Sequence, residues 1–195
     1  MSKFIIARTV TIRVINYHYG IPLVQIDTPV SYSLCDMIQM IKMWTKYADI
    51  YDWEFSNPEE SGSKTLSLKN DRAKMEDTEF DVYRKGSPYI ICKYGPIAIE
   101  LGARGFIKYR KVYPTIYQAV GYFPTEEEYV KNISVADIDG KYTVPMKTLP
   151  SASHSINNEL VEYGEKMKEF FKNKYQISNE IVEDSPYNEN KLIKK

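Results

Sequence analysis

Residues 79–113 contain several short runs of strand-forming residues, and turn residues separate these runs. The run 88–94 is rich in β-branched and aromatic residues and is bounded by glycine-containing turns, a composition typical of a strand. Similar runs follow at 97–101 and 106–112, and Gly102 and Gly105 between them permit a tight reversal. We therefore predict that this stretch forms the central sheet of the protein and that the other elements pack around it.

Positive charge is concentrated in the same stretch. Positions 84–113 hold seven basic residues and one acidic residue, although the formal net charge of the chain is zero. Aromatic side chains alternate with these cations, and this combination on a sheet is typical of surfaces that bind single-stranded nucleic acid. The residues that we predict to contact an anionic partner are Lys93, Tyr94, Arg104, Lys108, Tyr109, Arg110 and Lys111. A solvated sheet face, or a face for a protein partner, would explain the same pattern.

The beginning of the chain adds strands to this sheet. Residues 4–16 alternate between apolar and polar side chains with a period of two, which predicts a half-buried strand. A second strand is expected at 21–26, where Pro22 favours an edge position. The whole pattern predicts an α+β fold with a mostly antiparallel sheet, two main helices packed on it and a short third helix. The third helix is expected after Thr125, which can form a capping box with Glu128.

The first main helix is predicted to run from Ser33 to about residue 51, with Ser33 and Asp36 forming a capping box. Its apolar arc is wider than the stripe that a sheet alone would cover. The flank formed by Met40, Met43 and Tyr47 therefore needs a second cover. Another part of this chain can supply that cover, or a partner protein can, since methionine and tyrosine adapt well to partner surfaces. The second reading makes these three residues candidate protein-binding residues.

The rest of the chain completes one predicted domain at 1–177. Residues 54–78 are polar and rich in turn residues, which predicts a long loop. Acidic residues at 49–60 are a candidate complement to the basic stretch, within one molecule or between copies. A second main helix is predicted at 155–175, because its apolar residues form a single stripe. The polar segment 178–195 is predicted to be a disordered tail.

Several classes of site lack a signature in this sequence. Two cysteines and two histidines predict neither a disulfide framework nor a metal centre, and no cofactor motif or catalytic motif is found. We therefore expect a protein that is not an enzyme and that has no cofactor and no small-molecule substrate. A secretory signal and a membrane-spanning apolar run are also absent. The expected location is the interior of a cell, in the cytoplasm, or a virus particle, without contact with a membrane.

Two functional hypotheses follow from these observations. The first is a structural or assembly protein, a subunit of a larger complex that binds other subunits, including copies of itself. A virus or phage particle is a plausible setting, because the 20 lysines against 6 arginines and the 17 tyrosines suggest an AT-rich genome. The alternative is a protein that binds single-stranded nucleic acid through the basic sheet, or an inhibitor of a protein that handles nucleic acid.

Overall fold

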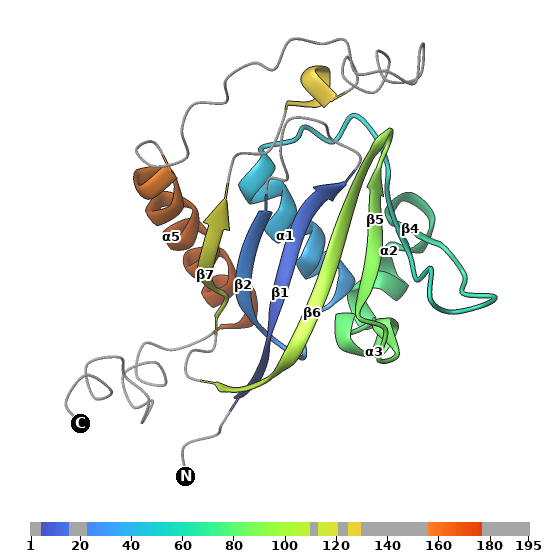
Figure 1. Cartoon of the computed structure of the whole chain (residues 1–195), viewed down its shortest axis with the longest axis horizontal. Coiled ribbons are helices and arrows are strands. Elements are labelled where there is room, and N and C mark those ends of the chain that lie inside the picture. Colours follow the sequence, from blue (N-terminus) through green and yellow to red (C-terminus); the bar gives the residue numbers. More distant parts are fainter. Residues whose placement is uncertain (1–4, 16–22, 110–112, 121–124, 130–155, 177–195) are drawn as a thin grey trace.

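The computed structural model of the 195-residue chain describes residues 5–15, 23–109, 113–120, 125–129 and 156–176 (Figure 1). Within these residues, seven strands form one sheet in the order β4-β3-β5-β6-β1-β2-β7, and each neighbouring pair is antiparallel. The strands are β1 (Ile5–Ile15), β2 (Leu23–Pro29), β3 (Trp53–Ser56), β4 (Leu66–Ser67), β5 (Tyr89–Tyr94), β6 (Ile97–Tyr109) and β7 (Thr115–Val120). The helices are α1 (Leu34–Thr45), α2 (Leu68–Asp77), α3 (Phe80–Arg84) and α5 (Ile156–Tyr175), and a helical turn covers 126–129. The predicted α+β fold with an antiparallel sheet is confirmed.

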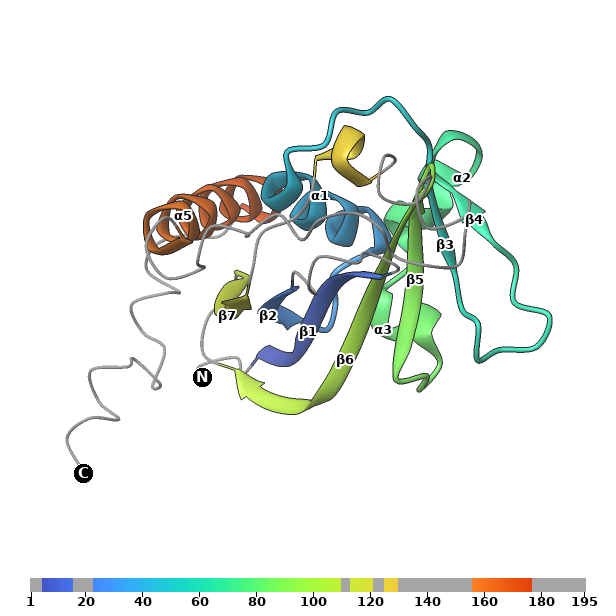
Figure 2. The same cartoon turned by 45° about the horizontal axis from the view of Figure 1, so that its top comes forward.

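One face of the sheet packs against helices. Helix α1 lies against this face between α5 and α2, which contact it on opposite sides (Figures 1 and 2). The alternation predicted for β1 produces this arrangement, because Val10, Ile12 and Val14 are buried toward the helices. Thr11 and Arg13, on the opposite side of the strand, remain partly exposed. The sheet therefore has an apolar face under the helices and a polar face that we call the open face.

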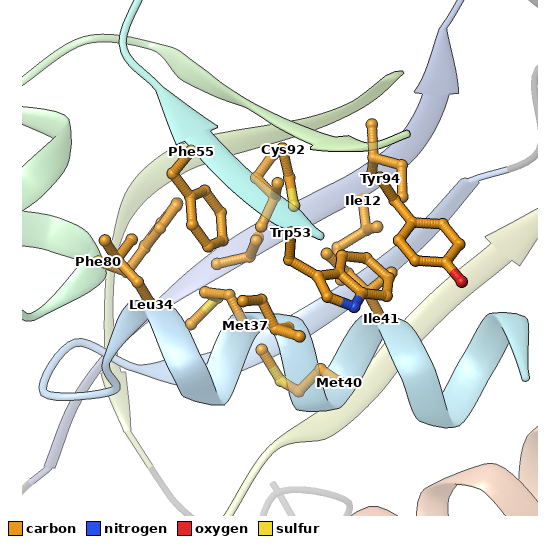
Figure 3. Close-up of a cluster of buried hydrophobic side chains, with 14 of the residues drawn as sticks. Ile12, Leu34, Met37, Met40, Ile41, Trp53, Phe55, Phe80, Cys92 and Tyr94 are labelled. Carbon is orange, nitrogen blue, oxygen red and sulfur yellow. The ribbon is translucent and has the colours of Figure 1, made fainter. Parts of the chain in front are cut away.

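The core lies between the sheet and α1. Figure 3 shows side chains of the strands, among them Ile12 and Phe55, pointing toward Met37 and Met40 of α1. Trp53, Phe55 and Met40 are each at most 1% exposed. Burial of such side chains contributes about 1.5–3 kcal/mol each to folding, so this layer stabilises the docking of α1 on the sheet.

Helix α1 begins as predicted and ends earlier. The Ser33 hydroxyl accepts a hydrogen bond from the Asp36 amide, and the Asp36 carboxylate accepts one from the Ser33 amide, so the capping box is confirmed. The helix ends at Thr45 because Lys46 adopts a left-handed conformation with φ of 58°. The chain then turns back toward the sheet, and the ring of Tyr47 stacks on that of Tyr94 in β5.

The sheet differs from the prediction at two points. The predicted reversal between 97–101 and 106–112 is wrong, because β6 is one strand of 13 residues. Gly102 lies inside its ladder, opposite Tyr89 on one side and Thr11 on the other. The predicted edge position of the second strand is also wrong, because β2 lies between β1 and β7. The strand begins at Leu23, and Pro22 lies outside the described residues.

Two helices replace parts of the predicted loop and sheet. Residues 54–78 contain β4 and α2, and α3 occupies the start of the stretch predicted to be the central sheet. Helix α2 buries only Met75, so it lacks the apolar stripe by which a helix is recognised. Helix α3 has five residues, which is too short for a periodic pattern.

Helix α5 is confirmed close to its predicted position. Tyr163, Met167 and Phe171 are buried, as expected from their position on one stripe. The Tyr163 hydroxyl donates a hydrogen bond of 2.8 Å to the carbonyl oxygen of Met40, which ties α5 to α1. The capping box at Thr125 and Glu128 is also present, with both hydrogen bonds at 3.2 Å. The predicted tail 178–195 lies outside the described residues.

Candidate functional site

The predicted protein-binding flank of α1 is largely covered by this chain itself. Met40 is fully buried and Tyr47 is 6% exposed, while Met43 is partly buried against the core. Helix α5 covers Met40, and Tyr94 covers Tyr47. The prediction that Met40 and Tyr47 contact a partner is therefore wrong. The first of the two readings is confirmed, because the second cover of α1 comes from within the chain.

Several cations of the basic stretch are engaged by acids of the same molecule. Arg84 is buried and pairs with Asp81 at 2.9 Å. Lys85 pairs with Glu60, which belongs to the acid-rich segment. Lys93 on β5 lies directly opposite Glu54 on β3 in the sheet register. The acids at 49–60 thus complement part of the basic stretch within one molecule.

Tyr94 does not lie on the open face. It alternates in β5 with the exposed Lys93, so its ring points to the helix side and is fully buried. The ring stacks on that of Trp53, with centroids 4.2 Å apart. The prediction that Tyr94 stacks on a nucleic-acid base is therefore wrong, because its ring is enclosed in the core.

The open face is mixed in charge where its side chains are described. Arg13 donates two hydrogen bonds of 2.9 Å to the carboxylate of Glu100, and Lys93 and Arg104 are exposed on the same face. Lys108 and Tyr109 belong to β6, where they pair in register with Ile6 and Ile5 of β1. Arg110 and Lys111 lie outside the described residues. The described cations therefore do not form the continuous basic surface that the sequence predicted.

A groove of about 690 Å³ runs along the side of α1 that faces away from the sheet. We call it the α1 groove. Its floor is a helical stripe at Cys35, Ile38, Gln39 and Lys42. One wall is α2, through Leu68, Lys69, Arg72 and Glu76, and the other is α5, through Phe170 and Lys174. The segment Asp49–Trp53 closes one end. The groove thus brings α5 together with α1, α2 and the segment that follows α1.

The segment at the end of the groove is held by a network around Tyr94. The Ile50 amide donates a hydrogen bond of 3.0 Å to the Tyr94 hydroxyl, which in turn donates one of 3.1 Å to Glu126. The same Glu126 oxygen accepts a hydrogen bond of 3.0 Å from the Ala48 amide. Although its backbone is fixed in this way, Ile50 is 68% exposed and Tyr51 is 38% exposed. Two large apolar side chains are thus presented to solvent on an anchored support.

The acids along the groove have partners within the chain. Asp49 pairs with Lys42 at 2.6 Å and accepts a hydrogen bond of 3.1 Å from the indole of Trp53. The hydrogen bond from Lys42 lowers the pKa of the Asp49 carboxyl. Asp52 accepts a hydrogen bond of 3.0 Å from the Lys69 amide, so it caps the N-terminus of α2.

The cations along the groove are less completely paired. Lys174 pairs with Asp36 and Glu76 at the end opposite Ile50. By contrast, the exposed side chains of Lys69 and Arg72 form no ion pair with any side chain in the described ranges. The α2 wall therefore presents two positive charges outside any ion pair of the described residues, and Arg72 lies close enough to Asp49 and Glu76 to help lower the pKa of both carboxyls.

The thiols are poorly suited to nucleophilic chemistry. Burial, followed by a hydrogen bond with Glu76, raises the pKa of the Cys35 thiol to about 12. Burial also raises the pKa of Cys92, which is completely enclosed. Among the described residues, no group of three or more His, Cys, Asp or Glu side chains is placed to hold a metal ion. None of the helices in the described ranges is long and apolar enough to span a membrane.

Sequence reasoning identified neither the groove nor its exposed residues. The acidic cluster that includes Asp49 and Asp52 was recognised, but its partners Lys42 and the α2 amide were not. Ile50 was assigned to the helix, where its exposure could not be foreseen. Its exposure follows from the end of α1 at Thr45, and no sequence motif marks that end.

Comparisons with known proteins identify a fold but no family. No protein-family model and no curated protein matches this sequence. A solved structure, a protein of unknown function from Methanosarcina mazei Go1, is similar with a TM-score of 0.54 and 12% sequence identity. The similarity covers 73% of this chain and 87% of that protein. At this identity the likeness concerns the fold alone.

Proposed function

We propose that this chain is a non-enzymatic assembly protein that becomes a subunit of a larger protein complex. The observation that carries the proposal is the anchored pair of apolar side chains, Ile50 and Tyr51, at the end of the α1 groove. Exposed apolar side chains grouped beside a concavity are typical of protein-binding surfaces, and tyrosine is enriched at such surfaces. The fixed backbone of the segment lowers the entropic cost of binding.

Other properties of the described residues are consistent with this proposal. The acidic groups along the groove are engaged in capping and ion pairing, and the raised pKa of Cys35 disfavours its thiolate. A virus or phage particle is the setting that we propose from the lysine-rich and tyrosine-rich composition. The alternative, binding of single-stranded nucleic acid by the sheet, has weaker support because Tyr94 is enclosed and the open face is mixed in charge.

The test is purification of the tagged chain from the cells or particles that encode it, followed by size-exclusion chromatography with light scattering. We expect a defined complex, and we expect Ile50→Asp to release the chain from it. Val82→Asp is the matched control, because Val82 is 62% exposed on α3 and does not line the groove. A wild-type chain that elutes only as a monomer without partners would refute the proposal.

The same chromatography examines the nucleic-acid alternative. The purified chain is run with a labelled single-stranded oligonucleotide at low and moderate salt, because contacts with phosphates weaken steeply as salt rises. If the alternative holds, the oligonucleotide co-elutes at low salt, and Lys93→Glu together with Arg104→Glu removes it. Under our proposal the oligonucleotide elutes alone in both salts.

A further inference from the structure

We infer that the α1 groove binds a segment of a partner protein in which acidic residues flank large apolar side chains. This inference rests on the proposed function and specifies the chemistry of the partner. The groove offers two kinds of contact that are close together, one apolar and one positively charged, and the occupant must satisfy both.

The apolar contacts lie at one end and along the α5 wall. Ile50 and Tyr51 are exposed at the end, and the partly buried Phe170 lines the wall. Ile38 in the floor is only 3% exposed, whereas the other floor residues, Cys35, Gln39 and Lys42, are partly exposed. An apolar side chain of the partner could enter between Ile50 and Tyr51 at the end of the groove and Phe170 on the α5 wall. It would then remove its own apolar surface and that of these three side chains from water.

The charged contacts lie on the α2 wall. Lys69 and Arg72 lie on either side of a kink in α2, where Asp71 has non-helical backbone angles, and both side chains line the groove. Neither forms an ion pair within the described residues, whereas Asp49 and Glu76 are paired with Lys42 and Lys174. The lining of the groove holds four cations, Lys42, Lys69, Arg72 and Lys174, and three acids, Asp49, Asp52 and Glu76. An acidic partner complements this excess of positive charge.

The groove also excludes some occupants by its shape and lining. The exposed apolar side chains Ile50 and Tyr51 lie at its end, and the cations Lys69 and Arg72 lie on the α2 wall. A small inorganic anion would neutralise the α2 wall but leave Ile50 and Tyr51 exposed. A purely apolar segment would leave the two cations facing the partner without a counter-charge. An amphipathic acidic segment is the occupant that matches both walls.

The experiment measures binding of a fluorescent peptide of sequence GDELFEDLG to the full chain by anisotropy. Two control peptides separate the contributions: GNQLFQNLG lacks the acids, and GDESSEDSG lacks the apolar anchors. We expect the first peptide to bind at low salt, and each control to bind at least about tenfold more weakly, since ion pairs and apolar burial both contribute. Raising the salt should weaken the binding of GDELFEDLG and leave the binding of GNQLFQNLG unchanged.

Matched variants then locate the site. Lys69→Glu together with Arg72→Glu should weaken binding of the acidic peptide at least about tenfold. Lys93→Glu together with Arg104→Glu makes the same change in charge on the open face and should leave the affinity unchanged. All four side chains are exposed, so circular dichroism should show that both double variants remain folded. Ile50→Ser is expected to weaken binding without altering the salt dependence.

Several outcomes would overturn the inference. The first is that GDELFEDLG does not bind at about 1 mM, a concentration at which even weak complexes form. The second is that the three peptides bind equally well. The third is that only the open-face double variant loses binding. Displacement of the peptide by inorganic phosphate at equal concentration would identify a simple anion site instead. Concentration-dependent dimers in light scattering that Ile50→Ser abolishes would identify a second copy as the occupant.

The two proposals fail in different ways. If the chain purifies within a complex that Lys69→Glu and Arg72→Glu leave intact, and if the acidic peptide does not release it, the assembly proposal stands and the groove inference fails. If the chain purifies alone, the proposed function fails, whatever the peptide does.

Discussion

Lys174 near the end of α5 forms an ion pair of 2.5 Å with Asp36 in the first turn of α1, across 138 positions of sequence. Asp36 is fully buried, and it also accepts the capping hydrogen bond from Ser33 and a hydrogen bond from Tyr175. One carboxylate therefore fixes the start of α1 and the end of α5 together.

Asp36→Ala should lower the free energy of unfolding by about 2–4 kcal/mol, because a helix cap and a charged hydrogen bond are lost together. Chemical denaturation monitored by circular dichroism measures this change. Glu162→Ala is the control, since it breaks the exposed Glu162–Lys166 pair on the same helix as Lys174 and should leave the midpoint unchanged. Equal effects of the two substitutions would show that the buried network has no special contribution.

Gly95→Ala should destabilise the protein more than Gly86→Ala, by about 1 kcal/mol or more. Both glycines have positive φ, so both substitutions introduce backbone strain of about 1–2 kcal/mol. A Cβ on Gly95 would also lie 2.5 Å from the ring of Tyr51, whereas nothing lies within 4 Å of a Cβ on Gly86. Thermal unfolding of the two variants compares them. Adding Tyr51→Ala to Gly95→Ala should recover part of the loss, and a failure to recover it would contradict the steric explanation.

Cys35 should react with iodoacetamide far more slowly than an ordinary thiol. Burial and the hydrogen bond with Glu76 raise its pKa to about 12, so at pH 8 the reactive thiolate is far scarcer than that of an ordinary thiol. Mass spectrometry after timed quenching measures the rate, and guanidinium-unfolded protein supplies the reference. Cys35→Ala should abolish native-state labelling, because Cys92 is completely enclosed. Fast labelling of native Cys35 would contradict the prediction.

The same thiol should make stability depend on pH in alkaline solution. Because the pKa of Cys35 is higher in the folded state, its contribution to stability is complete below pH 9 and is lost as pH rises toward 12. Unfolding measured between pH 8 and pH 11 should therefore show a decline that is smaller in Cys35→Ala. An identical decline in the two proteins would assign the effect to other groups.

Tyr94→Phe should loosen the segment that carries Ile50 without unfolding the protein. The substitution removes the hydroxyl that shares the Ile50 amide with the Ala48 carbonyl and that donates to Glu126, at a cost of about 1–2 kcal/mol. Hydrogen exchange followed by NMR should show faster exchange of the Ile50 amide. The Lys46 amide, which bonds to the Lys42 carbonyl, is the internal control and should be unchanged.

Local patterns in the sequence predicted local structure well. The alternation in β1 and the stripe on α5 each reflect which side of one element faces the core, and the two capping boxes involve residues three positions apart. The continuity of β6 could not be predicted, because Gly102 remains in the ladder through its neighbours Thr11 and Tyr89. Helix α2 was missed because its stability comes from Asp52 and Asp71, which cap it, and not from an apolar stripe.

The candidate site depended on contacts that no local pattern specifies. The net charge of the basic stretch was counted correctly, yet its effect depends on partners such as Asp81 for Arg84 and Glu60 for Lys85. The exposure of Ile50 follows from the left-handed conformation of Lys46. Lysine rarely adopts this conformation, so the residue type does not predict it.

The pairing of β1 with β6 has a consequence for synthesis of the protein. These neighbouring strands join residue 5 to residue 109, so β1 emerges from the ribosome long before its partner exists. Until then it can pair only with β2, and its other edge presents unpaired N–H and C=O groups. Helix α5, which covers α1, emerges later still. The nascent chain thus passes through a stage at which a chaperone or a premature partner can reach a strand edge that the finished protein conceals.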